Sequence, residues 1–297
     1  MDAGTATAQV RRKLREVWRS VRSDNEVVAN RLLNRGPRAS YRRQPRTLSP
    51  VAERVAADLV RTGVATTSVS ELMPDDNLWL ALRSRAEQLR SRDDLVVDPA
   101  KPFLTELMGS SPAVAPDDPL LALALHPQVR GVAEAYCGMH LRVQDLNIWV
   151  NSPVEGSPTQ SQRWHRDLPE DFAIVKCFVY LSDVPDGAGP LQYAAGSNTA
   201  AGRKIRLQAE FDGVGHRISD EEVSAAFGDG VVIARGPAGT VVFADTRGVH
   251  RGGFASTHER VVAQITYASR ASSRPRNLRP APGTTAAELP DLCLVRS

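Results

Sequence analysis

The spacing of hydrophobic positions changes near residue 140. Before it, apolar residues recur three or four positions apart, which is typical of helices with one buried face. After it, short apolar segments alternate with glycine, proline and aspartate, which is typical of strands joined by turns. The predicted helices lie near residues 8–22, 50–61, 76–91 and 117–137. The predicted strands lie near residues 64–69, 141–150, 172–182, 190–194, 231–234, 239–244 and 260–268.

Several short strands at this spacing predict a mainly β fold, a sandwich or barrel with flanking helices. Because the predicted helices precede the strands, an all-α fold and an alternating doubly wound α/β fold both fit poorly. One long insertion, residues 199–230, interrupts the strands. Within it, Ser219 and Glu222 form a capping-box pattern that predicts a helix over 220–227. We expect the insertion to be a lid or a binding loop.

The chain divides at about residue 50. Residues 1–50 are expected to form a basic helix and a linker, Arg35–Pro50, which contains Gly36, Pro37, Pro45 and Pro50. The rest, 51–297, is expected to be a single domain. Its parts are helices over 51–137, a β core at about 140–268, the insertion at 199–230 and a C-terminal tail at 269–297.

Charge is spread unevenly along the chain. The 297 residues carry a net charge of +3, but the first 50 contain 12 Lys and Arg against 4 Asp and Glu. A basic arm of this kind can bind nucleic acid or an anionic surface. We favour a helix that packs on the body through Trp18, and we do not expect a nucleic-acid partner. A partner helix and a homodimer stay open.

Composition excludes several classes of protein. With 42% hydrophobic and 24% charged residues, the chain does not resemble disordered, collagen-like or coiled-coil sequences. Its three cysteines form no close pair, which argues against a disulfide scaffold or a zinc knuckle. No apolar run approaches the ~20 residues that cross a bilayer, and the N-terminus lacks the apolar stretch of a secretory signal. We therefore expect a cytoplasmic enzyme with no membrane segment.

The most specific motif is His165-Arg166-Asp167. In an extended segment, residues two apart point to the same face, so His165 and Asp167 can reach one ion together. A third ligand is available in His250, which follows a predicted strand and can meet the pair only through the fold. Two histidines and one carboxylate form the facial triad of non-haem Fe(II) oxygenases, which leaves coordination positions open. An isolated His-x-Asp is weak evidence, so the order of the other residues matters.

An arginine follows this set at the head of the last strand. Arg260 lies ten residues after His250, and a guanidinium there can clamp a carboxylate through two hydrogen bonds. The sequence thus offers a His-x-Asp pair, intervening strands, a histidine in a glycine-rich turn and an arginine.

In this order and spacing, the sequence resembles the phytanoyl-CoA dioxygenase family of Fe(II)- and 2-oxoglutarate-dependent oxygenases. The resemblance covers roughly residues 117–268 and rests on Trp164–Asp167, Val179–Val184, Gly189–Asn198, Gly239–Phe243, His250 and Arg260. It implies a double-stranded β-helix, a cupin-like jelly roll with the metal in its mouth. Ala195 and Asn198 depart from the usual Pro-Gly-Ser-His turn, which puts only the shape of that turn in doubt.

The resemblance assigns His165, Asp167 and His250 to iron, and Arg260 to the distal carboxylate of 2-oxoglutarate. It implies a hydroxylase that uses Fe(II), 2-oxoglutarate and O2 on a small-molecule substrate, in keeping with secondary metabolism, with release of succinate and CO2. A desaturase, epoxidase or cyclase with the same iron centre is the alternative, followed by a non-catalytic jelly-roll binding protein. Related halogenases carry a small residue at the carboxylate position, so Asp167 speaks against halogenation.

Five further residues are candidates for contacts with the cosubstrate or the substrate. Asn147 lies on the strand before the metal pair, where a polar side chain often helps to hold the cosubstrate in this family. Lys176 could contact a carboxylate or face solvent at a sheet edge. Gln264 shares the face of the candidate clamp and could point toward the substrate. Tyr193 could line the pocket or belong to the core, and Arg247 could receive an anionic substrate, although a surface position is favoured.

Overall fold

The structure is a computed structural model, and it describes residues 25, 27–74, 77–95, 97, 101–167 and 173–295. The helix expected at 8–22 lies outside the described residues. The helices are the π-helix η1 (Val27–Leu33), α2 (Arg35–Arg43), α3 (Pro50–Thr62), α4 (Val69–Leu72), α5 (Leu78–Arg90), α6 (Pro119–Leu125), α7 (Pro127–Cys137) and α8 (Asp220–Phe227), with short 3-10 turns η2 (Gln160–Gln162), η3 (Gly202–Lys204), η4 (Gly228–Gly230) and η5 (Ala286–Glu288). Among the described residues, no helix has the length and apolar character to cross a bilayer.

The strands confirm the expected mainly β core. They are β1 (Val64–Ser68), β2 (Leu104–Glu106), β3 (Ala113–Val114), β4 (Arg142–Asn151), β5 (Ile174–Tyr180), β6 (Leu191–Ala194), β7 (Ala209–Phe211), β8 (His216–Ile218), β9 (Val231–Ala234), β10 (Thr240–Ala244), β11 (His250–Arg251), β12 (Arg260–Ala268) and β13 (Arg279–Pro280). Every strand longer than three residues coincides, within a few residues, with a segment expected from the sequence. The short strands β2, β3, β7, β8, β11 and β13 were not expected, because two or three residues give too little alternation to detect.

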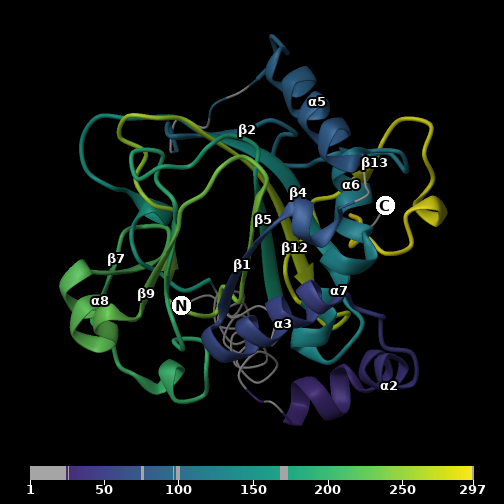
Figure 1. Cartoon of the computed structure of the whole chain (residues 1–297), viewed down its shortest axis with the longest axis horizontal. Coiled ribbons are helices and arrows are strands. Elements are labelled where there is room, and N and C mark those ends of the chain that lie inside the picture. Colours follow the sequence, from purple (N-terminus) through teal and green to yellow (C-terminus); the bar gives the residue numbers. More distant parts are fainter. Residues whose placement is uncertain are drawn as a thin grey trace, which may run out of the picture.

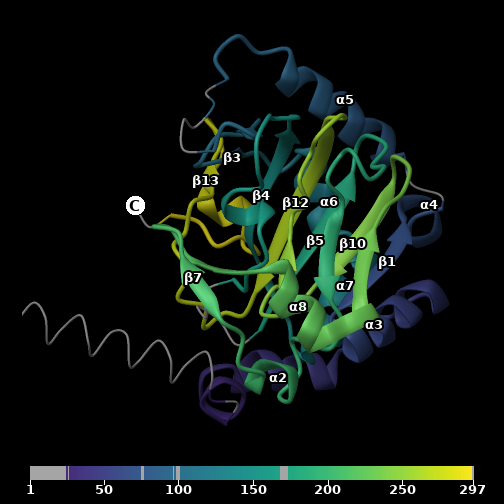
Figure 2. The same ribbon diagram turned by 90° about the vertical axis from the view of Figure 1, so that its left-hand side faces the viewer.

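Two antiparallel sheets build the jelly roll. The large sheet has the order β1-β10-β5-β12-β4-β2, and the small sheet has the order β11-β6-β9. Figure 2 shows β4, β12, β5, β10 and β1 side by side across the large sheet. Single bridges from His165 to His250 and from Trp164 to Ile218 extend the small sheet beyond β11. The metal motif therefore lies at an edge of the small sheet.

The central strands of the large sheet are buried on both faces. On β5, Val175, Cys177 and Val179 pack with the helices, whereas Phe178 and Tyr180 belong to a second cluster between the sheets. Alternation along a strand places these two sets on opposite faces. In Figure 1 the helices α3, α5, α6 and α7 lie on one side of the large sheet, and α8 with β7 and β9 lies on the other. This arrangement explains why apolar residues occupy both faces of β5 and most positions of β12.

Local sequence signals set the join between α3 and β1. The Ser49 side chain accepts a hydrogen bond from the Ala52 amide, and Pro50 occupies the first turn, where its missing N–H costs nothing. Gly63 ends the helix with φ 83°, a left-handed conformation that glycine adopts without strain. A β-carbon at Gly63 would also collide with Tyr193 and Asn198. The turn therefore carries the chain from helix to strand only with glycine at this position.

Two expectations about the N-terminal half differ from the structure. The expected linker over Arg35–Pro50 contains helix α2, because Gly36 and Pro37 fall in the first turn, where a proline does not break a helix. The stretch 117–137 forms two helices, because Pro127 disfavours a helical conformation at His126, and α7 begins afresh there. In the insertion, the helix expected at 220–227 is confirmed, with the Ser219 hydroxyl accepting from the Glu222 amide.

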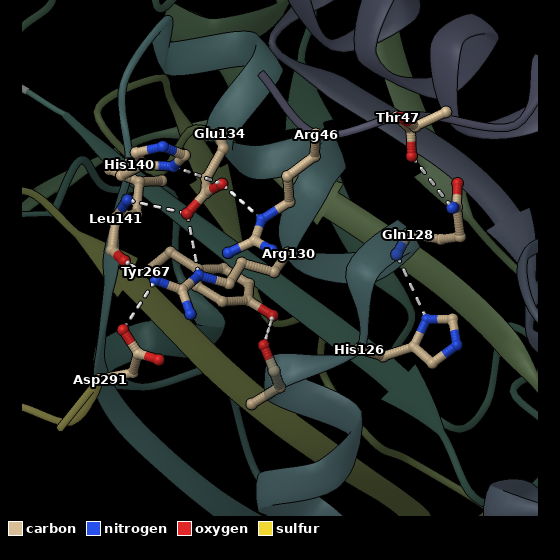
Figure 3. Close-up of polar contacts among 11 residues, drawn as sticks. Arg46, Thr47, His126, Gln128, Arg130, Glu134, His140, Leu141, Tyr267 and Asp291 are labelled. Carbon is tan, nitrogen blue, oxygen red and sulfur yellow. Dashed lines mark hydrogen bonds and ion pairs between the residues drawn. The ribbon is translucent and has the colours of Figure 1, made fainter. Parts of the chain in front are cut away.

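A buried charged network joins distant parts of the chain (Figure 3). Glu134 on α7 accepts from Arg46 Nε at 2.6 Å, from Arg130 Nε at 2.8 Å and from His140 Nδ1 at 3.1 Å. Arg130 also donates to Asp291 at 3.0 Å. Glu134 is fully buried and compensates the charge of Arg46, and it shares the compensation of Arg130 with Asp291. The network ties the N-terminal segment and the C-terminal tail to α7.

Candidate metal centre

Main-chain hydrogen bonds bring the His-x-Asp segment alongside β11. The amide of His165 donates to the carbonyl of His250 at 2.9 Å, and the amide of His250 donates back to His165 at 2.9 Å. The Asp167 amide donates to the Thr246 carbonyl, also at 2.9 Å. Two segments 85 residues apart in the sequence are therefore held as a pair of short strands, as the metal hypothesis requires.

The three side chains converge on one point. The Nε2 atoms of His165 and His250 each lie 3.9 Å from Asp167 Oδ1, and the two ring centroids are 4.4 Å apart. All three ligand atoms lie within 4.8 Å of one another. This spacing lets one ion contact all three groups.

The opposite nitrogens of both rings are occupied. His165 Nδ1 lies 2.9 Å from the Arg163 carbonyl, and His250 Nδ1 lies 3.0 Å from the Gly248 carbonyl. Because a carbonyl can only accept, both Nδ1 atoms carry the proton and both Nε2 atoms keep a free lone pair. The rings are thus in the tautomer that a metal needs.

The protonation states also suit a metal. Burial, reinforced by the neighbouring His250, lowers the pKa of His165 to about 3, and burial lowers the pKa of His250 as well. Burial alone would raise the pKa of Asp167, but Lys176 and the two imidazoles hold that pKa well below its usual range. At neutral pH the set is two neutral imidazoles and one carboxylate, which is the donor set of a non-haem iron site.

The triad lies in the wall of a cavity of about 170 Å³ between the two sheets. Arg260, which is only 6% exposed, lies in the same wall. Its Nη2 donates to Asn151 Oδ1 at 3.1 Å and its Nη1 donates to the Gly189 carbonyl, but its Nε has no hydrogen-bond partner. No carboxylate among the described residues pairs with it. A buried guanidinium without an anion is costly, so the cavity is suited to an anionic ligand.

Two of the five further candidates line this cavity. Lys176 places Nζ 2.7 Å from Asp167 Oδ2, so it contacts a ligand of the candidate metal site. Gln264 donates from Nε2 to Asp145 Oδ2 at 3.3 Å, and its Oε1 is buried without a partner. Both side chains are therefore available to ligands in the cavity.

The structure does not bring the other three candidates into the cavity wall. Asn147 bonds the loop after β2, accepting from the Met108 amide at 3.1 Å and donating to the Gly109 carbonyl at 2.8 Å. The fully buried Tyr193 donates to the Asp245 carbonyl at 2.8 Å, and Arg247 pairs with the Asp245 carboxylate at 2.5 Å. The contacts of Tyr193 and Arg247 stabilise the loop that leads to His250.

Several cavity residues were missed in the sequence. They come from β2 and the segment before it and from the turn before the metal motif: Lys101, Phe103, Leu104, Glu106, Ser161 and Gln162. The register of β2 against β4 sets Leu104 opposite Asn151 and Glu106 opposite Trp149, so these side chains share the cavity face. A three-residue strand carries no periodicity, and no signal in the sequence identified it.

The insertion at 199–230 contributes no residue to the cavity wall. It packs beside the metal motif instead. Trp164 Nε1 donates to Asp220 Oδ1 at 2.7 Å, and Arg251 Nη1 lies 2.8 Å from the same oxygen. The Arg251 guanidinium also stacks 4.4 Å above the Trp164 ring. The insertion therefore supports the residues next to both histidines, and the expectation of a lid finds no support in these contacts.

Comparison with known proteins identifies one family. The family model described as phytanoyl-CoA dioxygenase (PhyH) matches residues 81–262. No curated protein matches the sequence. Among solved structures, the epimerase SnoN, in complex with Fe3+, alpha ketoglutarate and nogalamycin RO, has 21% identity and a TM-score of 0.55, covering 79% of this chain and 96% of its own.

Two other solved structures are similar in fold. The non-haem alpha ketoglutarate dependent carbocyclase SnoK from nogalamycin biosynthesis has 22% identity and a TM-score of 0.51, covering 73% of this chain and 86% of its own. EctD from S. alaskensis, with 2-oxoglutarate and 5-hydroxyectoine, has 19% identity and a TM-score of 0.51, covering 76% and 81%. At these identities the likeness concerns the fold, and it agrees with the expected jelly roll.

Proposed function

Because the chain belongs to the phytanoyl-CoA dioxygenase family and is a 2-oxoglutarate-dependent non-haem iron enzyme, we propose that it hydroxylates an unactivated C–H bond of a small molecule. The reaction consumes O2 and 2-oxoglutarate and releases succinate and CO2. The observation that carries the proposal is the presence of the His-Asp-His set and a buried, anion-free arginine in one cavity.

His165, Asp167 and His250 are the proposed iron ligands. Their free Nε2 atoms and the Oδ1 atom fit an ion that prefers nitrogen and oxygen donors, and three ligands leave room for a cosubstrate. Bound Fe(II) supplies the oxidising chemistry when 2-oxoglutarate is decarboxylated. The protein supplies the preset tautomers, the orientation of the ligands and a cavity lined largely by buried side chains.

Arg260 is proposed to bind the distal carboxylate of 2-oxoglutarate. Asn151 and the Gly189 carbonyl fix its guanidinium, so little side-chain entropy is lost when the anion arrives. Because the site is buried, a carboxylate there gains a strong charge-assisted interaction. This assignment accounts for an arginine that otherwise has no charge partner among the described residues.

Gln264 and Trp149 are proposed to contact the substrate. Asp145 can only accept, so it fixes the Gln264 amide with Nε2 toward itself and Oε1 unpaired in the cavity wall. Trp149 Nε1 is likewise buried with no hydrogen-bond partner among the described residues, and Trp149 lines the same cavity. An unpaired acceptor and an unpaired donor on neighbouring strands favour a substrate that bears a hydroxyl group, which can satisfy both.

Other outcomes of the same iron chemistry form the second candidate function. The similar structures include an epimerase and a carbocyclase, both from nogalamycin biosynthesis. Cyclisation, epimerisation, desaturation or epoxidation is therefore the alternative to hydroxylation, in keeping with a role in secondary metabolism. We also propose a cytoplasmic location, because reducing conditions there would keep a ferrous ion from oxidation.

Succinate formation tests the proposal. The purified chain is supplied with Fe(II), ascorbate, 2-oxoglutarate and a pool of hydroxylated small molecules, and succinate is quantified. The wild type should form succinate, and Asp167→Ala should not. Asp186→Ala, which removes a carboxylate that is 73% exposed, serves as the matched control and should retain activity. Equal succinate from wild type and Asp167→Ala would reject the assignment of the iron site.

A further inference from the structure

We propose that Lys176 is a positioning residue for the metal centre. It holds Asp167 so that only one carboxylate oxygen binds the metal. Its charge lowers the affinity for the metal and raises the affinity for the dianionic cosubstrate. The inference rests on the proposed function, since it concerns how the same three ligands work. From the sequence, Lys176 could contact a carboxylate of the cosubstrate or substrate, or face solvent at a sheet edge. The structure instead places it on an inner strand and pairs it with a carboxylate of the protein.

The two oxygens of Asp167 have different surroundings. Oδ1 lies 3.9 Å from both imidazole Nε2 atoms, whereas Oδ2 lies 2.7 Å from the Lys176 ammonium. A carboxylate can bind a metal through one oxygen or through both. With Oδ2 engaged by an ammonium, only Oδ1 is directed to the ion. Asp167 then occupies one coordination position, and the cosubstrate keeps the positions it needs.

The fold fixes both partners of this ion pair. Lys176 lies on the central strand β5, where its neighbours in the sheet are Ala244 on β10 and Thr266 on β12. The Asp167 amide is bonded to the Thr246 carbonyl, so the carboxylate projects from a fixed backbone. The Lys176 side chain is 13% exposed, and Asp167 is the only carboxylate that pairs with it in the described part of the chain. Neither group can move away from the other without leaving a buried charge uncompensated.

The ammonium acts on metal and cosubstrate in opposite directions. It draws charge from Asp167 and repels a nearby dication, so it weakens metal binding relative to an uncharged residue. It also leaves more positive charge at the centre, which attracts 2-oxoglutarate in addition to Arg260. A residue with only a packing role would not produce effects of opposite sign. The two affinities therefore report on the proposal separately from folding.

The test compares three variants of the full-length protein by calorimetry with Co(II), and then with 2-oxoglutarate added to the Co(II)-loaded protein. Lys176→Met keeps the length and removes the charge. It should bind Co(II) about tenfold more tightly and 2-oxoglutarate about tenfold more weakly than wild type. Lys176→Gln keeps an N–H donor without the charge and should shift both affinities in the same directions. Lys176→Arg retains the charge and should remain within about threefold of wild type.

Each result is decisive. A Lys176→Met protein that melts like wild type and binds both Co(II) and 2-oxoglutarate unchanged, or both more weakly, overturns the inference while leaving the iron assignment intact. If the melting temperature of Lys176→Met drops, Lys176→Gln provides the same comparison. If wild type and Asp167→Ala bind Co(II) equally, the proposed function itself fails, and the inference fails with it.

Discussion

The two candidate iron-binding imidazoles are set before any metal arrives. Each donates its Nδ1 proton to a carbonyl two residues earlier in the chain, so the local backbone selects the tautomer. The same burial that keeps the rings neutral also makes the site sensitive to acid. At the scale of single residues, the backbone therefore fixes the tautomer of each ring, and burial keeps both rings neutral.

Removing the proposed cosubstrate clamp should separate two affinities. Arg260→Ala leaves the distal carboxylate of 2-oxoglutarate without its buried partner, and we expect the affinity for 2-oxoglutarate to fall about a hundredfold. Metal binding should change little, because Arg260 contacts none of the three ligands. Calorimetry with Co(II) and 2-oxoglutarate measures both values. The exposed Arg235, changed to Ala, is the control; a parallel loss of metal affinity in Arg260→Ala would contradict the assignment.

The metal-free protein should lose stability as the pH falls below about 6.5, well above the pH at which ordinary carboxylates titrate. The pKa of His165 falls from its ordinary 6.5 to about 3 on folding, so the unfolded chain binds more protons below pH 6.5. The stability that this ring contributes is complete above pH 6.5 and is lost as the pH falls toward 3. Each such ring adds up to ~1.4 kcal/mol per pH unit to the slope.

Urea unfolding at several pH values measures this slope. His165→Asn should flatten the dependence between pH 6.5 and 4 relative to wild type. His258→Asn, which alters an exposed histidine, should not. An identical slope in all three proteins would show that His165 is not held neutral by the fold.

The sequence predicted the placement of single residues better than their partners. Alternation along an extended segment placed His165 and Asp167 on one face, and Gln264 on the face of Arg260, as the structure has them. The Lys176–Asp167 pair was not foreseen, because it depends on which strand lies beneath the motif. Long-range partners of this kind come from the topology, which local spacing does not encode.

At the scale of elements, the longer strands could be predicted from the sequence, but the packing of the insertion could not. Long strands with two buried faces read clearly as apolar runs, and Ser219 and Gly63 marked helix ends through backbone hydrogen bonding. The insertion at 199–230 was expected to be a lid or a binding loop, and in the structure it packs against Trp164 and Arg251. Its length alone carried no information about the direction in which it folds.

Removing the contact between the insertion and Trp164 should lower stability without changing the affinity for 2-oxoglutarate. Asp220→Ala leaves the buried Trp164 Nε1 without its acceptor, which should lower the free energy of unfolding by about 1–2 kcal/mol. Since no residue of 199–230 lines the cavity, 2-oxoglutarate affinity should stay within about twofold of wild type. Chemical unfolding and calorimetry measure the two effects. Ser224→Ala, on the exposed side of α8, is the control. A large loss of 2-oxoglutarate binding in Asp220→Ala would support the interpretation of the insertion as a lid.

At the scale of the whole molecule, the helices cover one face of the large sheet (Figure 1). The side chains that line the cavity, such as Phe178 and Tyr180, belong to the other face. The Glu134 network adds a second kind of support, because it connects α7 to segments near both ends of the described chain (Figure 3). Only the Arg130–Glu134 pair, four residues apart on one helix, follows from local spacing, since Arg46 and Asp291 approach them only in the folded chain. Short strands separated by turns predicted a sandwich or barrel, and the resemblance to the phytanoyl-CoA dioxygenase family narrowed this prediction to a jelly roll.

Breaking the Glu134 network should strongly lower the stability of the folded protein. Glu134→Ala leaves Arg46 and Arg130 without their shared carboxylate, and we expect a loss of about 3–5 kcal/mol in the free energy of unfolding. Arg61→Ala breaks a pair in which the arginine is 73% exposed and should cost less than about 1 kcal/mol. Urea denaturation of both variants provides the comparison. Similar small losses in the two proteins would mean that the buried network contributes little.

The central claim is that His165, Asp167 and His250 hold Fe(II) beside 2-oxoglutarate. Its most direct measurement is an anaerobic titration of Fe(II)-loaded protein with 2-oxoglutarate, followed by visible absorption. The wild type should develop a weak charge-transfer band that saturates at about one equivalent per chain, and Asp167→Ala should develop none. A wild type without the band, or an equal band in Asp167→Ala, would contradict the account.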